Sequence, residues 1–409
     1  MKAFQKIWVI AFRDLGRNRR RSGLTILAVV MGLALLIFIS GLIAGIFDSM
    51  ISFSILLNSG HVQVRAEGYE AERSSLEWQD LLNNNDELLK KAAGVPGVKV
   101  IAPVLWSNGF VDTPDEMVGV RITGIDPESN FHDPIRQGMI AGEYLQINDR
   151  DGVLIGKKLA EELGVGAGSK ISLLIGTSDG NMDEDIFTVR GVFATGVVLY
   201  DTGVYMPLPK AQAITNVGER ISALILLTDN AEMADAVAAA LREPRLSVVT
   251  WKDMNALILG AMQQGMVFYY LIYGIIILVV AVIIANTLLM SVFERTREFG
   301  ILAALGLKGR QIMTMVLLEA NTIALLGAIG GMAIGLLLVW YLSINGIAIG
   351  DEVAGMVEGY AYPSVFYAKF APGIFTGVTV AMLGIVLLAA LYPASYAARL
   401  EPVDALHAL

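Results

Sequence analysis

The sequence predicts an α-helical membrane protein with four transmembrane helices and an α/β extracytoplasmic domain. Of its 409 residues, 55% are hydrophobic and only 17% are charged, which is too apolar for a soluble protein. Four uncharged runs are long enough to cross a bilayer as helices. A long segment of ordinary soluble composition separates the first run from the other three. The four runs are Ser22–Phe47, Met254–Phe293, Ala320–Gly350 and Phe370–Ala398.

Composition also excludes several functions. Cysteine is absent, so the outer domain has no disulfides and no Cys-ligated metal. The net charge of −9 comes mostly from the soluble segment and argues against nucleic acid as a partner. The segment 152–158, GVLIGKK, is one residue short of a phosphate-binding loop and lacks the following Ser or Thr. We therefore expect no ATPase, no enzymatic activity and no cofactor in this chain.

The distribution of Lys and Arg predicts the orientation. Positive residues accumulate before the first run and between the second and third, whereas the loop between the third and fourth carries Lys369 against three acidic residues. By the positive-inside rule, both termini and the loop after the second run are cytoplasmic in an inner-membrane, multi-pass protein, and the large domain is periplasmic. The cytoplasmic set is Lys2, Lys6, Arg13, Arg17, Arg19, Arg20, Arg21, Arg295, Arg297, Lys308, Arg310 and Arg399.

The N-terminal part contains two predicted elements. Residues 1–23 form a cytoplasmic amphipathic helix along the membrane surface, because apolar residues such as Phe4, Trp8 and Phe12 share one helical face. A cleaved signal peptide is disfavoured, since the apolar run is too long and no small-residue cleavage site follows it. Residues 24–59 form transmembrane helix 1 and a stalk, with Gly41 and Gly45 as a weak small-xxx-small packing pair.

The soluble segment alternates strand-like and helix-like stretches. We expect an α/β subdomain built from residues 60–115 and 220–249, with a strand-rich subdomain inserted at 116–219. The strand-like stretches are His61–Val64, Val98–Leu105, Val118–Ile125, Val153–Ile155, Lys170–Ile175, Phe187–Phe193, Val204–Met206, Ala223–Leu227 and Ser247–Val249. Thr250 and Asp253 then form a capping box that opens one long helix, so residues 250–292 are a second stalk and transmembrane helix 2.

Residues 293–311 follow the second transmembrane helix as a short, charged, amphipathic helix that ends at a glycine. A membrane helix that ends in such an element has a surface for docking, and we expect it to receive force from a separate protein. Charged residues line one flank, and apolar ones supply contacts. The predicted docking residues are Glu294, Arg295, Arg297, Glu298, Phe299, Gly300, Leu302, Ala303, Leu305 and Gly306.

The remaining chain completes the membrane part. Residues 312–344 are transmembrane helix 3, in which Gly327, Gly331 and Gly335 form a packing face within the subunit or across a dimer. Residues 345–371 are an extracytoplasmic loop, 372–392 transmembrane helix 4, and 393–409 a cytoplasmic tail. Glu319, near the inner end of helix 3, is either a functional intramembrane acid or a cap at a helix start.

No catalytic or metal site emerges from the pattern. His61, His132 and His407 are scattered without ligand spacing, so no metal is expected. Glu294 and Glu298 could form a catalytic pair, but each has an arginine beside it, and ion pairs on a docking surface fit better. The acidic hairpin at 179–185 fits no calcium loop.

The segment ERTREFGILAALGLKGRQI at 294–312, followed by Glu319, resembles the signature of FtsX-like, MacB-like ABC-transporter permeases. GHVQV near residue 61, VLIGKKLAEELGVGAGSKISLL at 153–174, the segment 189–214, TWKDMNALILGAM at 250–262 and the tail PASYAARLEPVDAL resemble the lipoprotein-releasing permeases LolC and LolE. The resemblance covers nearly the whole chain. MacB-type efflux permeases share the architecture, and no segment matches a chaperone-binding loop.

This resemblance implies a permease subunit that transmits cytoplasmic ATP hydrolysis to its outer domain and extracts lipoproteins from the outer leaflet. The short helix would be the coupling helix on a cytoplasmic ABC ATPase dimer, which binds ATP and Mg²⁺. A second permease subunit, identical or related, and a periplasmic chaperone or adaptor would complete the assembly. Lipoprotein or lipid cargo would enter between the first two spans, past Met50, Phe53, Met262, Met266 and Tyr269.

Three alternatives stay open from the sequence. A MacB-type efflux permease for peptides or small molecules shares every feature above. A membrane sensor is less favoured, because the cytoplasmic parts are too short for a kinase or cyclase. A membrane-embedded enzyme is disfavoured, because no nucleophile–base or metal-ligand set is found.

Overall fold

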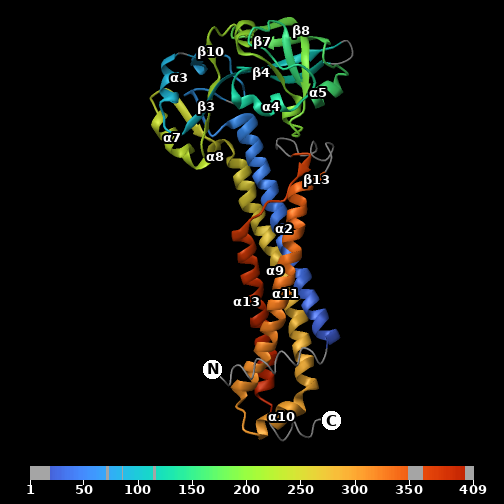
Figure 1. The fold of residues 1–409 in the computed structure, drawn as a ribbon. Coiled ribbons are helices and arrows are strands. Elements are labelled where there is room, and N and C mark those ends of the chain that lie inside the picture. The colour runs from blue at the N-terminus through green and yellow to red at the C-terminus, as the bar shows by residue number, and fades with distance from the viewer. Residues whose placement is uncertain (1–18, 71–72, 85, 114–116, 349–362, 401–409) are drawn as a thin grey trace. The chain divides into compact units, whose positions relative to one another are not determined.

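The computed structural model describes residues 19–70, 73–84, 86–113, 117–348 and 363–400. It divides into two compact units (Figure 1). The helical unit holds the described residues of 1–47, 262–347 and 367–409, and the sheet unit those of 48–261 and 348–366. Most of the predicted N-terminal helix over 1–23, much of the loop over 345–371 and the end of the tail over 393–409 lie outside the described residues.

Among the described residues, four helices are long and apolar enough to span a membrane. Each helix contains most of one of the uncharged runs. In lipid, a single continuous apolar segment can satisfy the hydrogen bonds of its backbone only by forming a helix. Together with the α/β sheet unit, they confirm the predicted fold class. The helices are α2 (Arg19–Ser54, continued by the π-helical turn η1, Ile55–Ser59), α9 (Ala256–Glu294), α11 (Gly309–Asn345) and α13 (Pro372–Ala398); the short α10 (Thr296–Ala304) connects α9 to α11.

Glycines allow α11 to approach α2 closely. A Cβ at Gly327, Gly331 or Gly335 would overlap the side chains of Val29, Leu33 and Ile37, respectively, so each glycine faces α2 within the same chain. Small residues let helix backbones come close, and dispersion contacts then stabilise the pair without a hydrophobic driving force.

Gly41 and Gly45 of α2 lie at contacts with later parts of the helical unit. The backbone N–H of Lys369 donates to the carbonyl of Gly41 over 2.9 Å, and a Cβ at Gly41 would overlap Val339. A Cβ at Gly45 would collide with the carbonyl of Tyr367. Both glycines therefore admit backbone or side-chain atoms that a larger residue would exclude.

The last long helix ends later than the sequence predicts. Transmembrane helix 4 is predicted to end at residue 392, before Pro393, but α13 continues to Ala398 with Pro393 inside it. Proline removes one backbone donor, yet membrane helices tolerate it when neighbouring helices supply packing. Pro393, Ala394 and Ala397 are buried, and the two alanines belong to a cluster with residues of α10 and α11.

The sheet unit is built on one ten-stranded sheet in the order β12-β1-β11-β3-β4-β9-β6-β8-β5, with β7 pairing β3 and β8. Small two-stranded sheets pair β10 with β2 and β13 with β14. The strands are β1 (Val62–Ala66), β2 (Leu82–Asn83), β3 (Val98–Asp112), β4 (Met117–Ile125), β5 (Met139–Gly142), β6 (Gly152–Gly156), β7 (Lys170–Gly176), β8 (Met182–Phe193), β9 (Val204–Pro207), β10 (Arg220–Ile221), β11 (Ala223–Thr228), β12 (Leu246–Thr250), β13 (Ile347–Ala348) and β14 (Val365–Phe366).

Short helices accompany this sheet. They follow strands or loops and contribute apolar faces to the core, as Leu159 of α5 and Val237 of α7 do. The helices are η2 (Trp78–Asp80), α3 (Asp86–Ala93), η3 (Asn130–His132), α4 (Asp133–Gln137), α5 (Lys157–Glu162), η4 (Tyr200–Thr202), α6 (Leu208–Ile214), η5 (Ala231–Met233), α7 (Ala234–Leu241) and α8 (Trp251–Met254).

The long strand β3 connects the two predicted subdomains of the outer domain. Residues 98–104 pair with β11, residues 109–112 pair with β7, and β4 lies along the other edge. The sequence predicts this strand only to Leu105, because Ser107, Asn108 and Gly109 are typical of a turn. In the structure the strand continues, since β4 pairs with it without interruption from Val104 to Asp112.

The predicted capping box is confirmed. The backbone N–H and hydroxyl of Thr250 donate to the Asp253 carboxylate over 2.9 and 2.8 Å. These hydrogen bonds hold the pKa of Asp253 below its usual range. The predicted single long helix is interrupted at Asn255, however, so α8 and α9 are separate. The Asn255 side chain accepts from the Ser54 hydroxyl over 2.6 Å and donates to the carbonyl of Trp251, which favours the break.

Replacing Gly331 by valine is expected to destabilise the helical unit, because the added side chain would overlap Leu33. Overpacking of this kind costs about 1–3 kcal/mol. The thermal unfolding midpoint of the full chain in detergent would fall accordingly. Gly377→Val on α13 is the matched control, since a Cβ there meets nothing within 4 Å. Equal midpoints for the two variants would contradict this packing.

Candidate functional site

The short helix α10 is anchored on one face to the ends of the long helices. Phe299 is 1% exposed and lies in an apolar cluster with residues of α9, α11 and α13. Gly300 is also buried, and Leu302 and Ala303 are half-buried against the same cluster. These four predicted docking residues therefore hold α10 in place. The other cluster members are Val292, Ile312, Met315, Val316, Ala394 and Ala397.

The opposite face of α10 is apolar and accessible. Leu305 is 75% exposed and Ile301 is 45% exposed. Arg297 is also exposed, and Gly306 reverses the chain with a φ of +94°, a conformation that favours glycine. Ile301 lies on α10 and Leu305 directly follows it, and the other face of this helix is buried in the apolar cluster. A surface of this kind fits the apolar groove of a partner protein.

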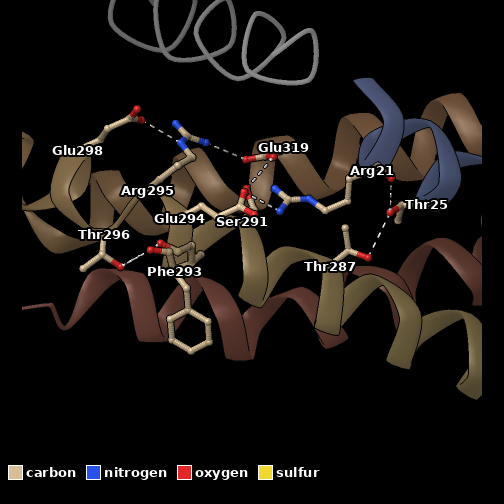
Figure 2. A network of polar contacts seen from close by, with 11 residues as sticks. Arg21, Thr25, Thr287, Ser291, Phe293, Glu294, Arg295, Thr296, Glu298 and Glu319 are labelled. Carbon is tan, nitrogen blue, oxygen red and sulfur yellow. Dashed lines mark hydrogen bonds and ion pairs between the residues drawn. The ribbon is translucent and has the colours of Figure 1, made fainter. Parts of the chain in front are cut away.

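Arg295 lies between α9 and α10 and is buried, at 8% exposure. Its Nη1 lies 3.2 Å from Oε2 of Glu319, which is 7% exposed, and its Nε lies 3.2 Å from Oε2 of Glu298 (Figure 2). The Ser291 hydroxyl lies 3.5 Å from the other Glu319 oxygen. The guanidinium also stacks on Phe299, 5.1 Å from the ring centroid. This cluster links α9, α10 and α11 through one buried charge pair.

This arrangement corrects two sequence-based expectations. Arg295 is predicted on the docking flank, but its side chain points inward to Glu319. Glu319 is considered as a cap at a helix start, yet α11 begins at Gly309, well before it. Partners separated by 24 positions on different helices leave no local signal in a sequence. The short-range pair of Arg295 with Glu298 follows the helical spacing that the sequence shows.

A second set of polar contacts joins α2 to α9. Arg21 forms an ion pair with Glu294 over 2.7 Å, and the hydroxyls of Thr25 and Thr287 lie 3.2 Å apart (Figure 2). Glu294 thus holds the first membrane helix and is not free for docking alone. Further along the two helices, the buried hydroxyls of Ser40 and Tyr273 lie 2.8 Å apart. Because α2 and α9 are antiparallel, these pairs follow one continuous seam.

The residues predicted to contact cargo fall in both units. Met50 is buried and Phe53 half-buried in the sheet unit. In the helical unit, Met262 is half-buried and Met266 is 45% exposed. Tyr269 packs edge-on against Phe47, with ring centroids 6.3 Å apart. The cavity that they would form remains a prediction.

No grouping of three or more His, Asp or Glu side chains suited to a metal occurs within the described ranges. His61 has a structural contact instead: its Nδ1 accepts from the backbone N–H of Thr228 over 2.9 Å. Partial burial lowers the pKa of His61, so this imidazole is neutral at neutral pH.

Two known families match the chain. Residues 22–243 match the MacB-like periplasmic core domain, and residues 270–402 match the FtsX-like permease C-terminal domain. The first match covers more than half of the sequence and includes α2 and most of the sheet unit. The second includes α10 together with the buried pair of Arg295 and Glu319.

Curated proteins of similar sequence cover nearly the whole chain. The lipoprotein-releasing system transmembrane protein LolC of Neisseria meningitidis serogroup B is 23% identical over 95% of this chain and 96% of its own length. LolE of Haemophilus influenzae is 24% identical over 93% of this chain and 92% of its own. The pyoverdine export ATP-binding/permease protein PvdT of Pseudomonas fluorescens is 25% identical over 99% of this chain and 59% of its own.

A double-mutant cycle on Arg295 and Glu319 tests the buried pair. Arg295→Leu or Glu319→Leu alone would leave a buried charge without its partner and cost about 3–5 kcal/mol. The double variant should lose far less than the sum, as measured by denaturant unfolding of the full chain in micelles. The pair of Arg21 and Glu294 is the control, because its side chains are 26% and 40% exposed. Its coupling should be about 0–1 kcal/mol, and equal coupling in both cycles would contradict the assignment.

Proposed function

The chain belongs to the FtsX-like permeases that carry a MacB-like periplasmic core domain, and from this premise we propose that it is an ABC-transporter permease that releases lipoproteins from the inner membrane. The observation that carries the proposal is α10, which is fixed by a buried ion pair and presents exposed Leu305 and Ile301. Relatives named for lipoprotein release match over nearly the full length, which supports the cargo.

In this proposal, α10 lies in the cytoplasm and the sheet unit in the periplasm. Arg297, Lys308 and Arg310 are exposed at the α10 end of the bundle, and positive residues favour the cytoplasmic side. The start of α2 and the end of α13 lie at this end of the bundle, since Arg21 pairs with Glu294, and Ala394 and Ala397 share a cluster with Phe299. The proposal therefore also places both termini in the cytoplasm. The chain is then an inner-membrane protein with a large periplasmic domain.

The proposed partner at α10 is a cytoplasmic ABC ATPase dimer. Leu305 and Ile301 would enter an apolar cleft of the ATPase, and Arg297 would lie at its rim. ATP and Mg²⁺ belong to that partner, and this chain supplies no cofactor. A second permease subunit, identical or related, would bind the other half of the ATPase dimer.

Force would pass from α10 through its charge pairs. Closure of the ATPase moves α10, and the ion pair of Arg295 and Glu319 carries the displacement to α11. The pair of Arg21 and Glu294 carries it to α2. Helices α2 and α9 both continue beyond the helical unit into the sheet unit, since the boundaries fall at residues 47 and 261. They are the proposed path of mechanical transmission.

The cargo would be a lipoprotein whose acyl chains occupy the membrane beside α9. This helix keeps many large apolar side chains exposed, among them Phe268, Leu271 and Leu278. The sequence-based expectation is entry between the first two spans, but α2 and α9 of one chain are joined by polar pairs. We therefore place cargo entry between α9 and the second permease subunit. Met50, Phe53, Met262, Met266 and Tyr269 remain the proposed contacts, and a periplasmic chaperone or adaptor would receive the cargo.

Export of a peptide or small molecule is the second candidate function. PvdT, which is named for pyoverdine export, matches 99% of this chain at an identity similar to that of the lipoprotein-releasing relatives. The two functions share the ATPase and the coupling helix. They differ in the cargo and in the periplasmic partner.

Leu305→Arg is expected to reduce ATPase recovery about 10-fold or more when the full chain is purified gently from native membranes, because a charge replaces an apolar docking contact. Ile186→Arg, on exposed β8, is the matched control and should retain the ATPase. Undiminished ATPase with Leu305→Arg would refute the docking surface. Mass spectrometry of the bound material separates the functions: lipidated proteins indicate lipoprotein release, and an adaptor without them indicates export.

Single cysteines test the orientation, since the natural chain contains none. A membrane-impermeant maleimide applied to spheroplasts should label Asp179→Cys in the β7–β8 hairpin. Lys308→Cys should be labelled at least about 10-fold less until the membrane is opened, because the positive-inside rule places it in the cytoplasm. Both positions are exposed, so the maleimide's access to them differs only by the side of the membrane on which each lies. The reverse labelling pattern would invert the proposed topology.

A further inference from the structure

The sheet unit contains a cavity of about 230 Å³ that the proposed transport function does not use. Residues of strands β3, β4 and β9 and of the short helices η3 and η4 line it. At about 30 Å³ per water molecule in the liquid, this space exceeds what a single buried water requires. It is large enough for a ring or a short chain that carries one polar group.

The cavity has an excess of positive charge. Arg121 is the one charged side chain among its described lining residues, and within the described chain no carboxylate lies within ion-pair distance of it. Its guanidinium stacks on Trp106, 4.9 Å from the ring centroid. Such stacking holds a guanidinium on its apolar face and leaves its N–H groups directed outward. The cavity therefore offers a cation without a counterion.

Neutral hydrogen-bonding groups surround this cation. Burial raises the pKa of Tyr205 to about 12 and that of Tyr200 further still, so both phenols keep their protons. Burial also lowers the pKa of His132 to about 3, so its imidazole is uncharged at neutral pH. Thr123 and Thr202 add hydroxyls. The buried carboxylate of Asp201 lies close enough to contribute to the raised pKa of Tyr205, and it accepts hydrogen bonds from Thr195. The polar groups that line the cavity itself are neutral apart from Arg121, and several can donate to an anion.

His132 is one of the residues that line the cavity. It is 4% exposed, and its Nε2 is buried without a hydrogen-bond partner among the described residues. Its neighbour Phe131 and the opposite Ile225 are apolar. The wall thus combines apolar side chains with the neutral imidazole of His132.

The cavity also borders the end of the first long helix. Leu57 and Asn58 of the π-helical turn η1 are among its lining residues. The N–H of Gly60 donates to the carbonyl of Ile55 over 2.9 Å and closes this wide turn. π-helical turns are rare and occur frequently at functional sites.

From these observations we propose that the cavity between Arg121, His132 and η1 binds a small organic anion, with a carboxylate or phosphate at Arg121 and an apolar body against Trp106 and Phe131. The bound anion contacts η1 and thereby the end of α2. The site does not depend on the proposed transport function, because all of its lining residues lie within the sheet unit.

Binding is tested by calorimetry on the full-length protein in nanodiscs, with benzoate, phenyl phosphate and the neutral isostere benzamide as probes. At least one of the two anions should bind saturably, with a Kd of about 1 mM or tighter, and benzamide at least about 10-fold more weakly. The stronger of the two anions identifies the head group. Equal binding of benzamide, or no saturation by either anion, overturns the proposal.

Arg121→Gln should weaken binding of the preferred anion about 10-fold or more, because it removes a charge-assisted contact. Arg121→Lys should retain part of the affinity. Arg150→Gln, another exposed arginine of the sheet unit outside the cavity, is the matched control and should bind as the natural protein does. Unchanged affinity in Arg121→Gln would overturn the proposal, and the thermal unfolding midpoints of all three variants verify their folding.

Discussion

The buried ion pair between Arg295 and Glu319 is the constraint on which the helical unit depends. Removing two charges from water costs several kcal/mol per ion, so the pair contributes little net stability compared with apolar residues of similar size. What it fixes is position. The ion pair forms only when its two side chains are within a few ångströms, and Ser291 and Glu298 are further partners. These distances are met in one arrangement of α9, α10 and α11. The exposed face of α10 is presented in that one orientation.

The same helices show two grades of electrostatic contact. Arg21 and Glu294 are accessible enough for solvent to screen them, whereas Arg295 and Glu319 are not. The exposed pair can therefore exchange partners at low cost, while the buried pair must move as a unit. Glycines on α11 add a third kind of contact, in which close backbone approach replaces charge. Together these contacts favour rigid-body motion of α10 with α11, while the exposed pair lets the contact between the ends of α2 and α9 adjust.

Local patterns predict much of this structure, and long-range ones do not. Uncharged runs predict the four membrane helices, and the box of Thr250 and Asp253 marks a helix start, because these signals act within a few residues. The partner of Arg295 is not predictable, since an ion pair across two helices has no fixed spacing. Nor is the full length of β3 predictable, because continuous pairing with β4 overrides the turn-like Ser107–Gly109. Pro393 likewise gives a local stop signal that tertiary packing overrules.

The strand order has a consequence for biogenesis. Strand β1 lies between β11 and β12, which are synthesised far later. Nearly the entire sheet unit must therefore be synthesised before β1 can pair on both edges. Bringing such distant segments together is entropically costly and slow compared with local pairing. The final strand, β12, ends at Thr250, and α9 begins at Ala256. Completion of the sheet therefore coincides with the emergence of the second membrane helix, and a nascent chain arrested before β12 would leave one edge of β1 unpaired.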